Sequence, residues 1–269
     1  EIILVDDNSK DNTFQLIKNV TIGDDRVRCI RNSINKGFTQ TLIDTIQDLD
    51  AEYIAIHGSG DISIESRISV QVEYLLNNPN VGVVTTDLVN STAIVYDGTR
   101  ITTTDLLEKN RITHGAVMFR MECYRLVGGY RSFFHTRQDK DLWFRMSLIT
   151  DIHFIPKKLY KLVPMVDSVS QNGSNTGLPT LLSSFASFLI SERIRFGYDS
   201  LDKYGPHSAL YFNPAISNKL FWLNARKSLF SRKWNAVVSY LEIMRKINVN
   251  GFLLAILSLL IFFLKWLKK

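Results

Sequence analysis

Carboxylates that directly follow apolar segments are the residues of this sequence best suited to chemistry. Asp6 and Asp7 follow the apolar run at residues 1–5, and Asp61 follows another apolar run at 53–56 and a turn of small residues. An acid at the carboxyl end of a buried strand can bind a divalent cation or accept hydrogen bonds from a base or a ribose. An Asp in front of a helix can equally serve as its N-cap, so position alone leaves both roles open.

Asp139 is a further candidate of the same kind. It follows Gln138 at the start of a segment in which Leu142, Trp143 and Met146 recur at helical spacing. A carboxylate in the first turn of a helix interacts favourably with the helix dipole. It can also act as a general base toward a hydroxyl group. The residues alone leave both roles open.

Strand and helix patterns alternate along the chain and must position these acids. Strands are expected at residues 1–5, 26–31, 53–56, 81–84, 114–119, 153–155 and 161–163, and helices around 14–20, 38–46, 64–76, 120–126 and 138–146. This order predicts an α/β fold with a largely parallel, twisted sheet flanked by helices. Since parallel strands end at one edge of a sheet, we expect Asp6, Asp61 and Asp139 to face a common cleft.

The composition is that of a globular chain of one or two domains. It has 269 residues, of which 45% are hydrophobic. Cys29 and Cys123 stand alone, which indicates neither a zinc site nor a disulfide framework and suits a reducing compartment. A GxGxxG fingerprint and a GxxxxGK[ST] loop are both absent from the sequence, which disfavours a dinucleotide fold and a P-loop fold.

The end of the chain differs from the rest in charge and hydropathy. From residue 217 onward it carries ten of the 32 Lys and Arg residues but one of the 26 acids. Residues 251–264 contain no charge, and Lys265 and Trp266 follow. A membrane span needs about 20 apolar residues, so this segment predicts membrane association and leaves open whether it crosses. We expect an anionic membrane, not nucleic acid, as the partner; the alternative is a solvated helix face.

Several segments of the first half resemble the family 2 glycosyltransferases. They are EIILVDDNSKDNT at residues 1–13, NKG at 35–37, EYIAIHGSGDISIESR at 52–67 and RQD at 137–139. The resemblance covers about residues 1–151 and implies a nucleotide-sugar-binding GT-A fold. It also implies that one further strand and its loop lie ahead of Glu1.

The resemblance assigns Asp6 and Asp7 to the base and ribose of the nucleotide. It places Asn35 and Gly37 in the neighbouring loop. It also implies that Asp139 is the catalytic base.

The metal-binding motif of the family is altered in this sequence. The DxD, whose second Asp usually binds Mn²⁺ or Mg²⁺, falls on Gly58-Ser59-Gly60, so that Gly60 remains as part of the donor-binding loop. Asp61 is then the one local candidate for a metal ligand. A single carboxylate binds Mg²⁺ weakly unless substrate phosphates complete the coordination, so any Mg²⁺ or Mn²⁺ is expected to be weakly held.

Three further residues receive roles from the resemblance. Gln138 lies beside the catalytic base, Arg137 is within reach of a phosphate, and His114 is at the acceptor pocket. A His at the start of a strand can also have a purely structural role, so both readings of His114 stay open.

The sequence thus predicts three regions. They are a catalytic domain at 1–165, a linker and helix at 166–216, and a basic helical tail at 217–269 with a membrane-associating segment at 251–267. The predicted activity is transfer of a sugar, with inversion, from a nucleotide-diphosphate donor to a hydroxyl acceptor, lipid-linked or of a polysaccharide, at the cytoplasmic side of a membrane. The alternatives are a non-catalytic nucleotide-sugar-binding or membrane scaffold protein, and a nucleotidyltransferase.

Overall fold

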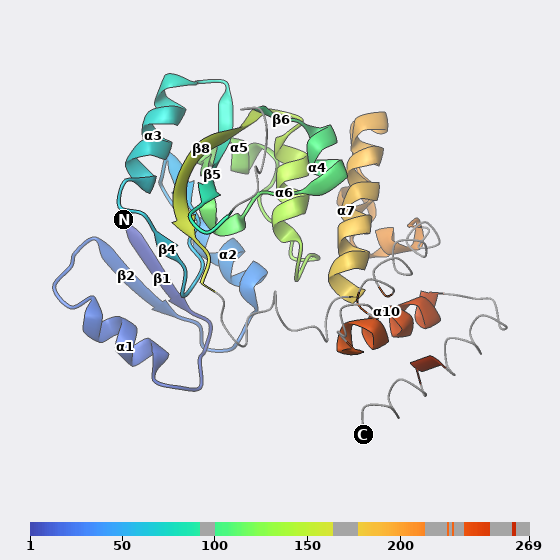
Figure 1. The fold of residues 1–269 in the computed structure, drawn as a ribbon, viewed down its shortest axis with the longest axis horizontal. Coiled ribbons are helices and arrows are strands. Elements are labelled where there is room, and N and C mark those ends of the chain that lie inside the picture. Colours follow the sequence, from blue (N-terminus) through green and yellow to red (C-terminus); the bar gives the residue numbers. More distant parts are fainter. Residues whose placement is uncertain are drawn as a thin grey trace.

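The computed structural model describes residues 1–91, 100–163, 177–212, 225, 228, 234–247 and 260–261. The first part of the chain forms β1 (Ile2–Asp6), α1 (Thr13–Val20), β2 (Val27–Arg31), α2 (Phe38–Ile46), β3 (Tyr53–Ala55), β4 (Ile62–Ser63), α3 (Arg67–Asn77) and β5 (Val81–Leu88). The later elements are β6 (Arg100–Ile101), α4 (Thr103–Lys109), η1 (His114–Ala116), β7 (Val117–Arg120), α5 (Met121–Leu126), α6 (Gln138–Met146), β8 (Asp151–Lys161), α7 (Gly177–Phe196), α8 (Ser200–Tyr204), η3 (Gly205–Leu210) and α10 (Trp234–Ile247). The result is an α/β fold, with the β1–α1–β2 unit at one end and α7 at the other (Figure 1).

The strands form two sheets. β1 and β2 pair in parallel, from Ile2 opposite Val27 to Asp6 opposite Arg31. The second sheet has the order β3-β7-β5-β8-β4, with β6 paired to β8. Within the described ranges no backbone pairing joins the two sheets, and the strand expected ahead of Glu1 stays a prediction.

The prediction of a largely parallel sheet was wrong. In the larger sheet β5 and β8 are parallel, whereas β7 runs antiparallel to both β3 and β5, and β4 and β6 run antiparallel to β8. An apolar run reveals that a strand is buried but not its direction, because direction is set by partners distant in sequence. The sheet is therefore mixed.

Most predicted elements are confirmed, but three boundaries differ. The helix expected from Ile64 begins at Arg67, because residues 62–63 pair with β8 as β4. The strand expected at 114–119 begins at Val117, and a 3₁₀ turn precedes it. The strands expected at 153–155 and 161–163 lie within or next to one continuous strand, β8.

Other predictions fall outside the described residues. The sequence also predicts a hairpin turn at 97–98 and a loop or linker at 171–179, and the first and most of the second lie outside the described residues. The same holds for the segment at 251–267, of which residues 260–261 are described as helical. Residues 177–179 form the first turn of α7. Across the part of the chain that the structure covers, none of the helices has both the length and the apolarity to traverse a bilayer.

Both faces of the larger sheet are buried. Val83 and Val84 are neighbours on β5 with no exposed surface, yet they belong to different apolar clusters. Val84 packs with Leu75 of α3, whereas Val83 belongs to the cluster that contains Trp143 of α6 and Phe185 of α7. Because successive side chains of a strand point to opposite faces, helices must cover both sides, as Figure 1 shows for α3 and α6. α7 thus shares the core of the preceding domain.

Candidate functional site

His114 lies where three parts of the chain meet. Its imidazole Nε2 is 2.7 Å from the Tyr130 hydroxyl, and its ring centroid lies 5.7 Å from that of Phe38 at the start of α2. The ring centroids of His114 and Trp143 of α6 are 6.1 Å apart. This arrangement brings α2, α6 and the segment before α6 together around one imidazole.

Helix α3 fixes the turn that carries His114. The buried guanidinium of Arg67 donates hydrogen bonds to the carbonyls of Ile56 and Gly115, and Gln71 Nε2 donates to Ala116 O at 2.9 Å. These donors satisfy carbonyls that the sheet leaves unpaired. The end of β3 and the 114–116 turn are therefore held in one place.

Asp139 lies in the first turn of α6, next to His114. Burial lowers the pKa of His114, and the nearby Asp139 carboxylate partly opposes this effect. Asp139 likewise acts on Tyr130, whose pKa is raised first by burial. No group among the described residues donates a hydrogen bond to the Asp139 carboxylate, which is partly exposed. Its oxygens remain available to accept a proton from a ligand.

The chain turns sharply before Asp139. Arg137 has a left-handed backbone, with φ of 66°, and immediately precedes α6. Its side chain is exposed, whereas Gln138 is 8% exposed. The predicted phosphate contact of Arg137 stays a prediction, and Gln138 contributes to packing more than to an open surface.

A buried ion-pair network fixes the segment that leads into α6. Arg131 bonds to Asp141 of α6 and, at 2.9 Å, to Asp199, the N-cap of α8. Arg145 bonds to the same Asp141 at 2.7 Å and to the Gly129 carbonyl at 2.7 Å. Buried charges need such partners, and here they join the start of α6 to α8. The network positions the backbone on both sides of Asp139.

Asp7 organises the loop before α2. Its carboxylate accepts hydrogen bonds from Asn32 Nδ2 at 2.7 Å and from the backbone N–H groups of Lys36 and Gly37, both at 2.8 Å. Burial alone would raise the pKa of Asp7, but these hydrogen bonds together lower it. Asn35 Oδ1 also accepts from the Gly37 N–H, at 3.2 Å. The predicted donor-binding residues therefore lie together, although the Asp7 carboxylate already bonds to the loop that precedes α2.

Asp6 has a different environment from Asp7. Its side chain is 1% exposed and lies 3.2 Å from Arg31 Nε, and Oδ1 accepts from the Ser9 N–H. The nucleotide contact predicted for Asp6 stays a prediction, but its buried carboxylate faces the protein.

Asp61 bonds to β8. Its Oδ2 accepts a 2.7 Å hydrogen bond from the Tyr160 hydroxyl, and its Oδ1 accepts one at 2.9 Å from the Val163 N–H. The Tyr160 oxygen also accepts from the Gly58 N–H at 2.9 Å. A Cβ on Gly115 would lie 2.1 Å from this oxygen, so the phenol fills the space between the two glycine-containing turns.

These residues do not fit a divalent cation site as they stand. Mg²⁺ and Mn²⁺ favour several oxygen ligands, and both Asp61 oxygens already accept hydrogen bonds from protein groups. Within the described ranges no three His, Cys, Asp or Glu side chains cluster in a way that could bind a metal ion. Gly60, which the resemblance aligns with the second Asp of a DxD, has a left-handed backbone with φ of 83° and offers no side-chain ligand.

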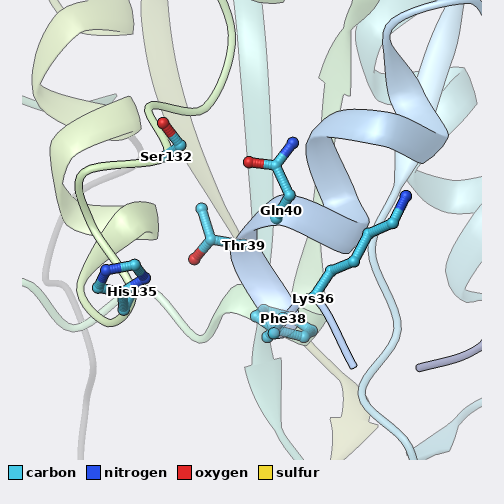
Figure 2. A pocket seen from close by; sticks show the side chains of 7 residues that line it. Lys36, Phe38, Thr39, Gln40, Ser132 and His135 are labelled. Carbon is cyan, nitrogen blue, oxygen red and sulfur yellow. The ribbon is translucent and has the colours of Figure 1, made fainter. Parts of the chain in front are cut away.

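A hollow of about 280 Å³ opens between the start of α2 and the segment before α6 (Figure 2). It is lined by Lys36, Gly37, Phe38, Thr39, Gln40, Ser132 and His135. Phe38 connects it to His114, and the loop that carries Ser132 and His135 leads into Asp139. The hollow thus lies between α2 and the loop that leads to the candidate base.

Contacts therefore join most of the predicted site residues. Asp7 bonds to Gly37, whose neighbour Phe38 touches His114, and His114 lies beside Asp139. On the other side, Asp61 bonds to a phenol that packs against the residue after His114. Sequence reasoning missed Phe38, Tyr130 and Tyr160 as members of the site. The sequence feature that relates to Tyr160 is the pair of glycines at 58 and 115, because a side chain at 115 would collide with the Tyr160 hydroxyl and one at 58 would crowd it.

Comparisons with known proteins agree with this architecture. The fold is α/β and GT-A-like, and residues 1–135 match the family described as Glycosyl transferase family 2. The match covers half of the chain, which therefore belongs to that family.

The Bacillus subtilis (strain 168) protein named "Putative glycosyltransferase EpsE" is 32% identical over 153 residues, which are 54% of this chain and 55% of EpsE. "Bifunctional glycosyltransferase pgtA" of Dictyostelium discoideum is 36% identical over 87 residues, 31% of this chain and 11% of pgtA. The chain thus spans about half the length of EpsE and a smaller part of pgtA.

Solved structures share the fold at low sequence identity. S. aureus TarS 1–349 in complex with UDP-GlcNAc has a TM-score of 0.59 and 11% identity, with 92% of this chain and 72% of that chain covered. The mannosyltransferase PcManGT from Pyrobaculum calidifontis, in complex with GDP-Man and Mn²⁺, has a TM-score of 0.56 and 14% identity, with 89% and 75% covered. These similarities concern the fold.

Proposed function

We propose that this protein transfers a sugar, with inversion, from a nucleotide-diphosphate sugar to a hydroxyl group of an acceptor. The observation that carries the proposal is the Asp139 carboxylate, which lies beside His114 and accepts no hydrogen bond from the described residues. An inverting transfer needs a base that removes the proton of the attacking hydroxyl. Membership in family 2 and the UDP-GlcNAc and GDP-Man complexes of the structural neighbours support a nucleotide-sugar donor.

In this mechanism each residue has a separate task. Asp139 accepts the hydroxyl proton as the acceptor oxygen attacks the anomeric carbon, while the bond from that carbon to the diphosphate oxygen breaks and the nucleoside diphosphate leaves. His114 is neutral at pH 7, since burial lowers its pKa, and bonds to Tyr130. Its bond to Tyr130 therefore helps to order the pocket beside Asp139. The Asp7-capped loop before α2 supports the donor nucleotide.

Replacing Asp139 with Asn tests this proposal. Asp139→Asn keeps the size of the side chain but removes the base, so turnover should fall about 10²- to 10⁴-fold. The Kd for the nucleotide sugar, measured by calorimetry, should not change. Glu108→Gln, an exposed acid on α4, is the matched control. Unchanged turnover in Asp139→Asn would refute the assignment of the base.

The alternatives give different results in the same assays. A non-catalytic binding protein would bind the donor with no transfer or donor hydrolysis by the wild type. A nucleotidyltransferase would release pyrophosphate from a nucleoside triphosphate, which a phosphate-release assay detects directly. The family membership favours the transferase over both.

A membrane location of the reaction is part of the proposal. The support is the excess of basic residues after residue 217 and the uncharged run at 251–264. We expect a lipid-linked or polysaccharide acceptor at the cytoplasmic side. Co-sedimentation with anionic and neutral lipid vesicles tests the tail: equal recovery in the supernatant with both would contradict it.

The proposed function allows a bound Mg²⁺ or Mn²⁺ but does not require one. PcManGT was solved with Mn²⁺, which makes a metal plausible in this fold. In this chain, however, a cation at Asp61 would have to displace the Tyr160 hydroxyl or rely on the phosphates of the donor. The residue roles proposed above therefore do not depend on a metal.

A further inference from the structure

The hollow beside α2 offers neutral polar groups to a ligand. Among the residues that line the hollow, Lys36 is the one with a permanent positive charge. Its Nζ lies 2.5 Å from Asp44 Oδ2. Gln40 Nε2 donates to the other oxygen of Asp44 at 2.6 Å. In Figure 2 the Lys36 side chain extends away from the loop that carries Ser132 and His135. The lining therefore provides little net charge to attract a diphosphate.

The groups that remain free are both donors and acceptors. Thr39 Oγ1 already donates to the Phe134 carbonyl at 2.7 Å, and the Gln40 amide nitrogen is engaged with Asp44. The amide oxygen of Gln40 is left as an acceptor. Ser132 and His135 have no hydrogen-bond partner within the described part of the chain, and both are exposed. A ligand that carries several hydroxyl groups would satisfy all three residues.

An aromatic surface completes the lining. Phe38 is 52% exposed, and its ring meets the His114 ring edge-on, at an interplanar angle of 83°. A ring exposed in this way is an apolar contact surface next to polar groups. The combination suits a sugar, because a pyranose presents C–H groups on its faces and hydroxyl groups around its edge.

We propose that this hollow binds one monosaccharide unit of the substrate, held by Phe38 and by hydrogen bonds to Gln40, Ser132 and His135. Its volume of about 280 Å³ lies at the lower end of the range for ligand sites, which fits a single sugar ring. The inference rests on the proposed function, since it assigns a sugar of that reaction to a hollow on the loop that leads to Asp139. The sugar belongs to the donor or to the acceptor, and the experiment separates the two sources.

The test fills the hollow without touching the core. Ser132→Phe places a large side chain in the hollow from an exposed position, and Ser69→Phe, at an exposed position of α3, is the matched control. Phe38→Leu is a second variant, which retains apolar volume but removes the flat ring. Circular dichroism and thermal unfolding establish that each variant is folded.

Two measurements decide the question. Calorimetry gives the Kd of UDP-GlcNAc and GDP-mannose, and of UDP and GDP without a sugar. Saturation-transfer NMR detects free glucose, galactose, mannose and N-acetylglucosamine bound to the protein.

A donor sugar in the hollow predicts that Ser132→Phe weakens binding of the nucleotide sugar about tenfold or more, with the nucleotide alone unaffected. An acceptor sugar predicts loss of the monosaccharide NMR signal with unchanged nucleotide-sugar Kd. In both cases Phe38→Leu acts in the same direction, and Ser69→Phe behaves as the wild type.

The inference is overturned if Ser132→Phe and Phe38→Leu match the wild type in both measurements. It is also overturned if the wild type gives no monosaccharide signal and binds UDP-GlcNAc and GDP-mannose no more tightly than UDP and GDP. Failure of the wild type to bind any nucleotide contradicts the proposed function instead, and the monosaccharide signal then still decides whether the hollow binds sugar.

Discussion

The Tyr160 hydroxyl donates a 2.7 Å hydrogen bond to Asp61 Oδ2 and accepts one from the Gly58 N–H, so that one phenol closes the loop after β3. Burial is the main cause of the raised pKa of Tyr160, and the bond to Asp61 adds to it. The phenol therefore remains protonated and able to donate over the whole physiological range. It provides Asp61 with a neutral partner.

We expect donor binding without a divalent cation. The Kd of the nucleotide sugar should be the same with EDTA and with Mn²⁺, because both Asp61 oxygens accept hydrogen bonds from the protein. Electron paramagnetic resonance of Mn²⁺ mixed with the protein alone should show the spectrum of the free ion. Donor binding that disappears with EDTA and returns with Mn²⁺ would contradict this expectation.

Replacement of Tyr160 by Phe should reduce stability. Tyr160→Phe removes a donor to a carboxylate, which typically costs about 1.5–3 kcal/mol, less where solvent can replace the donor. Urea unfolding measures the change. Tyr211→Phe is the control, since Tyr211 is 57% exposed and stacks on Tyr204. Equal midpoints for the two variants would show that the bond to Asp61 contributes nothing.

His114 should titrate at a pH below its ordinary value of 6.5, and lower still without Asp139. Burial lowers the pKa of His114, and the Asp139 carboxylate partly restores it. In the pH window between the folded and unfolded pKa the unfolded chain binds more protons, so this residue makes stability rise with pH there. NMR titration of the imidazole in wild type and Asp139→Asn checks the sign. An unchanged midpoint would place the two residues too far apart to interact.

Asp7 should make the protein sensitive to acid. Its hydrogen bonds lower its pKa below 3.8 despite the opposing effect of burial, so its contribution to stability is present above the unfolded pKa and is lost as the pH falls through the folded pKa. The melting temperature of Asp7→Asn should therefore approach that of the wild type as the solution is acidified. A constant difference between the two proteins across the acid range would exclude this role.

Asp141 should be among the positions most sensitive to substitution. It is 2% exposed and bonds to both Arg131 and Arg145, so Asp141→Asn leaves two buried cations with less compensation. Removal of one member of a buried ion pair typically costs about 3–5 kcal/mol. Asp24→Asn breaks a surface pair in which Arg26 is 77% exposed, and should cost much less stability, because solvent screens the pair. Chemical denaturation compares the two; similar losses would argue against the network.

The sequence allowed the helices and strands of the first half to be predicted because their apolar residues repeat at clear periods. Strand direction was not accessible, as β7 shows: its apolar run is equally compatible with parallel and antiparallel neighbours. The two-residue strand β4 was also beyond reach. It exists because Ile62 and Ser63 pair with the far end of β8, a relationship that has no local pattern.

The sequence predicted which residues are candidates for the site, but not the contacts that their side chains make with residues distant in sequence. Asp139 followed from the motif at 137–139, and the structure places it beside His114, while its role as a base stays a prediction. The burial of Asp6 and the bond between Asp61 and Tyr160 depend on Arg31 and on β8, which the local sequence does not reveal. Matching this sequence to the family motifs by position therefore identified the loops of the candidate site more reliably than the contacts of individual side chains.

Arg131 has consequences for how the protein can be divided. Its partner Asp199 lies 68 residues further along the chain, after α7, whereas every residue predicted for the site precedes residue 140. A shortened protein that stops at residue 165 would contain the whole predicted site and Asp141, but would lack the other two carboxylates that bond to this guanidinium, Asp199 and Asp202. The minimal unit that preserves the shape of the site therefore extends through α8.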